Sequence, residues 1–187
     1  FQKRLSDFRS VDAINLGSTV RSSKLKSLVS KAAKYDKVIV SLHGMSNSKR
    51  KNFGLSVEQI DLVQALSKHK GMALVVFGNP YSLYAFDDVP SVLVAYSDHK
   101  DVRDIAAQSM FGVYRIDGKL PVTASEKSAF NDGLIVSNKL IMGFASPEDM
   151  GFRSDLKTVV DSIAGEAISK KATPGCVVLV AKDGHIV

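Results

Sequence analysis

The sequence predicts an α/β fold: an open, mostly parallel, doubly wound sheet (an α/β/α sandwich) with a C-terminal helix-plus-strand extension. Three apolar runs predict strands of this sheet, namely KVIVSL at 37–42, MALVVF at 72–77 and SVLVAY at 91–96. The runs show little alternation of polar and apolar residues, which is typical of strands buried on both faces. Segments with helical spacing separate them, so βαβ units with right-handed crossovers are expected.

The N-terminal segment is expected to add one strand and one helix ahead of these runs. DAINL at 12–16 predicts a short strand. Ser22 or Ser23 is expected to cap a helix, because a serine hydroxyl accepts a hydrogen bond from the first helical turn. The apolar residues of that helix recur at helical spacing, and they are Leu25, Leu28, Val29, Ala32 and Ala33.

Two helices and an edge strand are expected between and after the apolar runs. Ser56 and Gln59 have the spacing of a capping box, which marks the start of a helix. A second helix is expected from about Lys100 to Phe111, with Val102, Ile105, Ala106 and Met110 buried. GKLPVT at 118–123 predicts an edge strand, because proline cannot donate to a central ladder.

The pattern changes after about residue 124. One or two short strands are expected within 135–144, and a linker at 147–151. An amphipathic helix follows, whose apolar stripe consists of Leu156, Val159, Val160, Ile163, Ala167 and Ile168. A strand is expected at 176–182, and Asp183-Gly184 predicts a hairpin turn. A hairpin so close to the last residue is expected of a chain cut from a longer protein.

Composition excludes several classes of protein. The chain has 187 residues, of which 45% are hydrophobic and 24% charged, as in a soluble globular protein, and no apolar run reaches the length of a membrane span. The net charge of +6 is scattered, and no aromatic residue interleaves with Lys49-Arg50-Lys51, so no nucleic-acid partner is expected. Cys176, the only cysteine, predicts a small core residue and cannot build a metal site alone. We expect no metal and no cofactor.

The candidate site residues follow the predicted strands. His43, Asn79, Tyr81, Asp98 and His99 come directly after the three runs, and ligands of open α/β sheets bind at the carboxyl ends of strands. Each also has a local interpretation. Asn79 can simply build a turn, His43 can hydrogen-bond at a strand end, Asp98 can cap a helix, and His99 can be solvated.

Several phrases, in one order, resemble a known family. VVFGNPYSL, VLVAYSD, AAQSMFG and GKLPVT, together with YDKVIVSLHGMS and FGLSVEQIDLVQAL, resemble the carboxyl-terminal α/β sandwich domain of glycoside hydrolase family 3. The likeness is closer to the β-N-acetylglucosaminidase branch than to the β-glucosidases, and it covers residues 1–133. Residues 134–152 are expected to be a linker with short strands.

The tail carries a second resemblance. PEDMGFRSDLKTVVDSIAGEAISKKATPGCVVLVAKDGHIV is similar to the opening of a serine β-lactamase-like domain of the penicillin-binding type. Residues 153–187 are therefore expected to be the truncated start of that domain. Its nucleophile lies in a Ser-x-x-Lys motif. The spacing from Ser23 to Lys26 matches this motif but falls in the glycosidase-like part, where we interpret it as a helix start.

The resemblance implies a protein without its own glycosidase centre. Family 3 enzymes place their aspartate nucleophile in an upstream TIM barrel, and the N-acetylglucosaminidase branch has an Asp-His acid/base pair on a loop of that barrel. The resemblance therefore transfers no catalytic role to this chain. The expected partners are that barrel, the downstream serine-hydrolase-like domain, and an amino-sugar or peptidoglycan-derived substrate at the domain interface. The resemblance also implies a bacterial periplasmic or secreted location.

Three functions remain open from the sequence. The first is a non-catalytic accessory domain of a bacterial family 3 glycosidase, whose strand-end residues line the substrate rim or an interdomain contact. The second is a small-ligand or partner-binding flavodoxin-like module. No G-x-G-x-x-G or G-x-x-x-x-G-K-[ST] motif occurs, which argues against bound phosphates. The third is a hydrolase in its own right, either as a β-lactamase-like fragment or with a serine or Asp-His centre.

Overall fold

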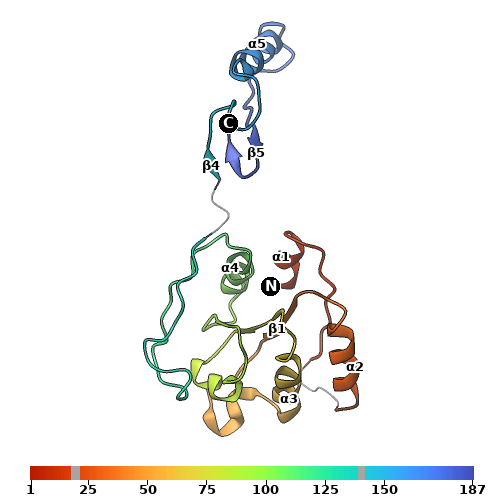
Figure 1. Ribbon diagram of the computed structural model, residues 1–187, viewed down its shortest axis with the longest axis vertical. Coiled ribbons are helices and arrows are strands. Elements are labelled where there is room, and N and C mark those ends of the chain that lie inside the picture. The colour runs from red at the N-terminus through yellow and green to blue at the C-terminus, as the bar shows by residue number, and fades with distance from the viewer. Residues whose placement is uncertain (18–21, 139–141) are drawn as a thin grey trace. The chain divides into compact units, whose positions relative to one another are not determined.

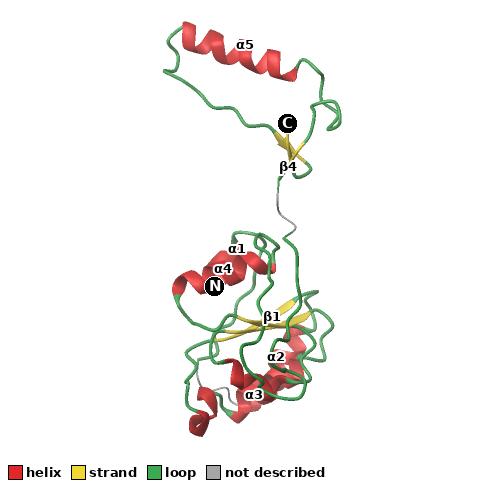
Figure 2. Cartoon of the chain, turned by 90° about the vertical axis from the view of Figure 1, so that its left-hand side faces the viewer, coloured by secondary structure: helices red, strands yellow, loops and turns green. Residues whose placement is uncertain are grey.

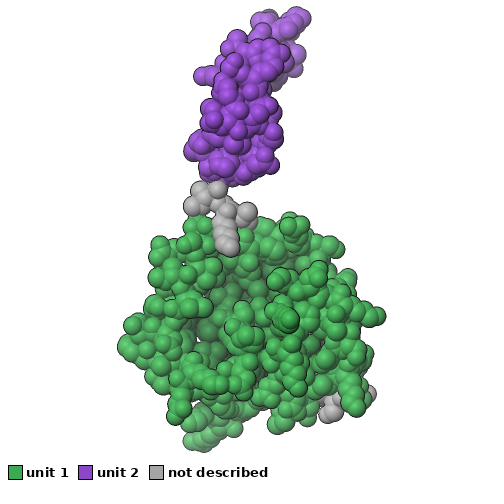
Figure 3. All heavy atoms as spheres, viewed as in Figure 1, with its two compact units in different colours: residues 1–138 green, residues 139–187 purple. Residues whose placement is uncertain are grey.

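The computed structural model describes residues 1–17, 22–138 and 142–187 (Figure 1). The chain divides into two compact units, Phe1–Asn138 and Lys139–Val187 (Figure 3), and each is described by itself. The boundaries expected from the sequence at residues 133 and 152 stay predictions. No helix in the described ranges is long and apolar enough to cross a membrane.

A parallel sheet is the centre of the first unit. Its strands are β1 (Val38–Leu42), β2 (Met72–Val76) and β3 (Val92–Val94), in the order β1-β2-β3. β1 pairs with β2 along its whole length, and β2 pairs with β3 over residues 92–94. Valine and isoleucine favour such strands because their branched side chains pack well on a pleated surface. The α/β prediction is confirmed at this level.

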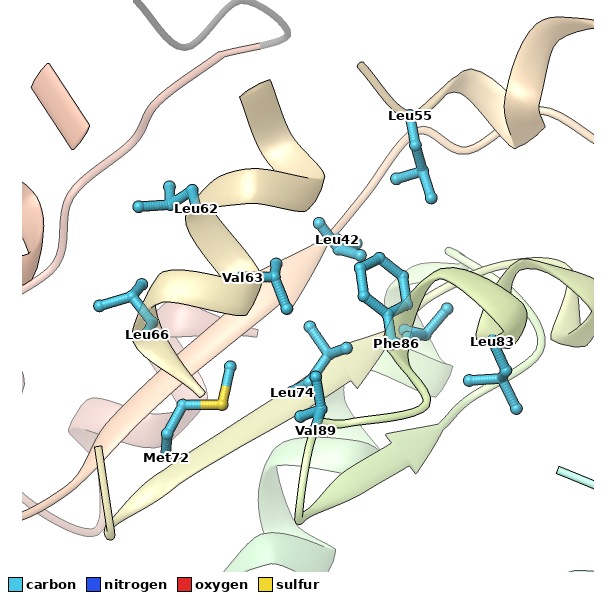
Figure 4. Close-up of a cluster of buried hydrophobic side chains, with 11 residues drawn as sticks. Leu42, Leu55, Leu62, Val63, Leu66, Met72, Leu74, Leu83, Phe86 and Val89 are labelled. Carbon is cyan, nitrogen blue, oxygen red and sulfur yellow. The ribbon is translucent and has the colours of Figure 1, made fainter. Parts of the chain in front are cut away.

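One face of the sheet packs on α2 (Ser22–Ala32), α3 (Val57–Leu66) and the 3-10 segment η2 (Pro80–Phe86). The apolar cluster on this face is drawn in Figure 4, and its labelled residues are Leu42, Leu55, Leu62, Val63, Leu66, Met72, Leu74, Leu83, Phe86 and Val89. The predicted capping box of α3 is confirmed. The Ser56 side chain accepts from the Gln59 amide at 3.2 Å, and the Gln59 side chain accepts from the Ser56 amide at 2.9 Å.

A second, smaller cluster lies against α1 (Gln2–Ser6) and α4 (Lys100–Met110). Val75 and Phe77 come from β2 and its end, and Ala106 comes from α4. Figure 2 shows α1 and α4 on one side of the sheet, and α2 and α3 on the other. A two-pronged ion pair between Arg4 and Asp104, at 2.6 and 3.2 Å, joins α1 to α4. The remaining 3-10 segment is η1 (Lys49–Gly54).

Two of the predicted strands, at 12–16 and 118–123, do not form. Residues 12–16 form no strand; Leu16 instead packs on the main cluster, and Asp12 accepts a hydrogen bond from Tyr35. Residues 118–123 form no strand either, because Leu120 exchanges backbone hydrogen bonds with 131–132 rather than with the sheet. α2 already includes Ser22 and Ser23, and the residue preceding it lies outside the described ranges.

The second unit holds a small mixed sheet and one helix. The strands β4 (Gly143–Phe144), β5 (Ala181–Lys182) and β6 (His185–Ile186) lie in the order β4-β6-β5. The hairpin turn predicted at Asp183-Gly184 is confirmed, since β5 and β6 pair antiparallel across it. α5 (Leu156–Ser169) has no buried residue. Part of the region expected to hold strands, 139–141, lies outside the described residues.

Cys176 corrects another prediction. It was expected in a buried strand, but residues 176–180 form no strand and the cysteine is exposed. The run that follows it is exposed as well, with Val177 at 97% and Leu179 at 65% of full accessibility. In this segment, pairing with a neighbouring strand is limited to Ala181 and Lys182, so among the described residues no strand covers the apolar residues before them.

Candidate functional site

The three strands deliver polar residues to one edge of the sheet. His43 directly follows β1, Asn79 lies three residues after β2, and Asp98 lies four residues after β3. Because parallel strands end at the same edge, residues from distant parts of the sequence meet there.

His43 and Asp98 form a hydrogen-bonded pair at this edge. Nδ1 of His43 lies 2.8 Å from Oδ1 of Asp98, although 55 residues separate them in sequence. The His43 side chain is 35% exposed and that of Asp98 27% exposed, so the pair is partly accessible to solvent. The structure therefore joins two of the five residues singled out in the sequence.

Ser41 completes a three-residue chain of hydrogen bonds. Its Oγ lies 3.0 Å from Nε2 of His43. Ser41 is not among the residues predicted from the sequence, because it lies inside an apolar run that has the pattern of a buried strand. The signal was available: residues two apart on a strand share a face, so Ser41 lies on the same face as His43.

An aromatic ring supports His43. The imidazole stacks on Phe77, with ring centroids 4.6 Å apart and planes 14° apart. Phe77 is 1% exposed, and the ring of Phe1 packs on it edge-on, with the two ring centroids 5.2 Å apart. Two hydrogen bonds and one buried ring thus fix the plane of the imidazole.

Asp98 is held by more than His43. Its Oδ2 accepts a hydrogen bond from the Gly44 backbone amide at 2.8 Å, and Nε of Arg103 lies 3.6 Å from Oδ1. The arginine distance exceeds that of a hydrogen bond, so its contribution is electrostatic. Partial burial alone raises the pKa of Asp98, but the hydrogen bonds from His43 and Gly44 and the charges of His43 and Arg103 together lower it. Asp98 is therefore ionised at neutral pH.

The other three candidates take up local roles. The Asn79 side chain accepts from the Tyr81 amide at 3.0 Å and caps η2, which is the turn-building role considered for it. Tyr81 is 47% exposed. His99, and not Asp98, caps α4, through a 3.4 Å contact with the Asp101 amide. Among the side-chain hydrogen bonds in the described ranges, none joins these residues to His43 or Asp98.

A shallow apolar groove lies elsewhere, beside β3 and α4. Its volume is about 260 Å³, and Ile105 and Ile116 line it together with Arg115 and Asp117. Ile105 was expected to be buried but is 50% exposed, because it faces this groove. The groove contains none of the predicted site residues.

Within residues 1–17, 22–138 and 142–187, no three histidine, cysteine, aspartate or glutamate side chains lie together as metal ligands would. Comparison of the chain with protein-family models, with curated proteins and with solved structures found no match.

Proposed function

We propose that this chain is the non-catalytic accessory domain of a bacterial family 3 glycoside hydrolase of the β-N-acetylhexosaminidase type. In this proposal, unit 1 is a doubly wound α/β/α sandwich, and the tail begins a serine β-lactamase-like domain. The ordered motifs from VVFGNPYSL to GKLPVT support the family. The observation that carries the role is the meeting of His43 and Asp98 at the carboxyl edge of a parallel sheet.

The chemistry of this edge suits contact with a sugar or with another domain. An imidazole, a carboxylate and a serine hydroxyl lie together there, partly exposed, and each can hydrogen-bond a sugar hydroxyl or an acetamido group. Tyr81 adds an exposed ring after the neighbouring strand, and aromatic rings are common at contact surfaces because they combine apolar area with a polar tip. The edge is therefore the proposed rim of the substrate cleft or interdomain contact.

The partners follow from the same proposal. An upstream TIM barrel would hold the glycosidase nucleophile and acid/base pair, which require two groups facing one glycosidic bond. The downstream serine-hydrolase-like domain would cover the apolar stripe of α5, in which Val159 is 44% and Ile163 64% exposed. An amino-sugar or peptidoglycan-derived substrate would lie at the domain interface, in the periplasm or outside the cell.

Two measurements on the isolated chain test the proposal. We expect no turnover of a chromogenic N-acetylglucosaminide, and robust turnover would contradict the accessory role. In a nuclear magnetic resonance titration with N-acetylglucosamine oligosaccharides, shifts are expected around His43 and Tyr81. Tyr81→Ala should weaken them, whereas Tyr114→Ala, at a tyrosine equally exposed elsewhere, should not. Tight nucleotide binding would instead favour the flavodoxin-like module.

A further inference from the structure

We propose that Ser41, His43 and Asp98 form a Ser-His-Asp site that hydrolyses short-chain carboxylic esters, with Ser41 as the nucleophile. This inference does not depend on the accessory role: that role is non-catalytic toward glycosides, whereas the site proposed here acts on carboxylic esters. It rests on the continuous line of contacts from the Asp98 carboxylate through both ring nitrogens of His43 to the Ser41 hydroxyl. Such sites are recognised by geometry and roles rather than by their order in the sequence.

The proton positions follow from the partners of the imidazole. Asp98 is ionised, and a carboxylate can only accept, so Nδ1 of His43 donates to it at 2.8 Å. In the neutral ring, Nε2 then carries a lone pair and no proton. The Ser41 hydroxyl, 3.0 Å away, donates to that lone pair. This is the arrangement in which an imidazole takes the proton of an attacking serine.

The imidazole is fixed in the orientation that this reaction needs. Phe77 stacks on one side of the ring, and the Gly44 amide fixes the second oxygen of Asp98. A base whose ring plane and tautomer are fixed in advance needs no rearrangement when the proton moves. Asp98 touches no substrate in this scheme and acts as a positioning residue for His43.

The backbone amide of Ser41 can stabilise the negative charge that develops on the substrate. Val38 donates to Gly71, and Leu42 accepts from Phe77, so Val38, Val40 and Leu42 form the bonds between β1 and β2. Because this alternation turns the N–H groups of Ile39 and Ser41 the other way, they point to the outer edge of β1. In the described ranges no strand pairs with that edge. The amide of a nucleophilic serine is a donor in known oxyanion holes.

Ile39 favours a small apolar acyl group. It precedes Ser41 by two residues, so it shares a face of β1 with the serine hydroxyl. Ile39 is 37% exposed, so part of its side chain is accessible to a ligand. An acyl chain of a few carbons can pack on it while its carbonyl carbon lies against Ser41 Oγ. An acetyl or butyryl ester is therefore the expected class of substrate.

The reaction balances with water as the only co-reactant. Ser41 Oγ bonds to the ester carbonyl carbon as its proton passes to Nε2 of His43, and the carbonyl π electrons move onto oxygen. When the carbonyl re-forms, the bond to the alcohol oxygen breaks and that oxygen takes the proton from Nε2. Water then attacks the acyl-serine and gives a proton to Nε2. The Ser41 Oγ–acyl bond breaks, Ser41 recovers its proton, and the carboxylic acid leaves.

Labelling of the full chain with a fluorophosphonate tests the site directly, because serine displaces fluoride to give a stable adduct. Mass spectrometry of the digested protein should place the adduct on Ser41. Ser41→Ala should abolish it, and His43→Gln should slow it by about 10²-fold or more, the usual contribution of a general base. Ser91→Ala is the matched control, since this exposed serine directly precedes β3, which is the other outer strand of the sheet. It should label like the unchanged chain.

Turnover and spectroscopy complete the test. Hydrolysis of p-nitrophenyl butyrate should be lost in Ser41→Ala. Asp98→Asn should slow acylation and move the ring proton of His43 from Nδ1 to Nε2, which a nitrogen resonance spectrum detects. A folded chain that gains no adduct at Ser41, or one that reacts at His43 or equally in Ser41→Ala, would overturn the proposal. None of these outcomes affects the sugar titration that tests the accessory role.

Discussion

The imidazole of His43 lies almost parallel to the buried ring of Phe77, with centroids 4.6 Å apart. His43 follows β1 and Phe77 follows β2, so the stack joins the ends of adjacent strands. Phe77, a member of the smaller apolar cluster, therefore also supports the imidazole that is hydrogen-bonded to Asp98.

Replacing Phe77 by leucine separates these two roles. Phe77→Leu keeps an apolar side chain in the cluster but removes the flat surface under His43. The unfolding free energy measured in urea should fall by about 1 kcal/mol, in the range for loss of an aromatic pair with most of the burial kept. Fluorophosphonate labelling of Ser41 should slow as well. A variant that is destabilised but labels at the original rate would show that the stack does not orient His43.

Asp98 makes stability depend on pH in the acid range. Its folded-state pKa is lowered from the ordinary value of 3.8, so the unfolded chain binds the proton more readily. The stabilisation is complete above that ordinary value and is lost as the pH falls through the folded-state pKa. Asp98→Asn should therefore show a smaller drop in unfolding free energy than the unchanged chain between about pH 6 and pH 3. Equal drops in urea titrations would contradict the assignment.

The capping box of α3 should contribute measurably to stability. Ser56→Ala removes the acceptor for the Gln59 amide, and loss of such a cap costs about 1 kcal/mol. Ser48→Ala is the matched control, because Ser48 precedes η1 without any side-chain cap bond. It should change the unfolding free energy by less than about 0.5 kcal/mol. Similar losses in both variants would mean that the cap itself is not what stabilises α3.

Gly71 is required by close contact with another part of the backbone. A Cβ added there would lie 2.0 Å from the carbonyl oxygen of Asp36, ahead of β1. Gly71→Ala should therefore displace the start of the β1–β2 pair and cost about 2 kcal/mol or more.

Gly118→Ala is the control for this change, since a Cβ there meets nothing within 4 Å. Thermal unfolding followed by circular dichroism should show a lowered midpoint only for Gly71→Ala. Equal midpoints for the two variants would show that the backbone at Asp36 can yield without cost.

Strands and helix starts that depend on neighbouring residues could be predicted from the sequence. The apolar runs placed β1 and β2 nearly to the residue, and the Ser56–Gln59 spacing marked the start of α3. β3 is shorter than SVLVAY implies. Tyr96, two residues after its end, has a positive φ of 59°, which a strand cannot continue through. Ser91 and residues 95–96 therefore belong to the flanking segments, although Ala95 still bonds to Val76.

Features that depend on pairing between distant segments could not be predicted in this way. A segment such as 12–16 has strand composition, but it needs a free partner edge at the right place, which composition does not encode. Cys176 and the valines after it have the pattern of a buried strand, but they are exposed, because no strand in the described part of their unit pairs with them. The site was predicted only in part, because the edge of the sheet was apparent while the contact between His43 and Ser41 depends on side-chain orientation.

The hydrogen bond between His43 and Asp98 joins the segments that follow β1 and β3, the two outer strands of the sheet, past the end of β2. Closing a contact of such long sequence separation has an entropic cost that local contacts do not have. We expect it to form once β1, β2 and β3 have aligned, and therefore late in folding. Any reagent whose reaction requires an oriented His43 therefore also reports how many molecules in a preparation have completed their sheet.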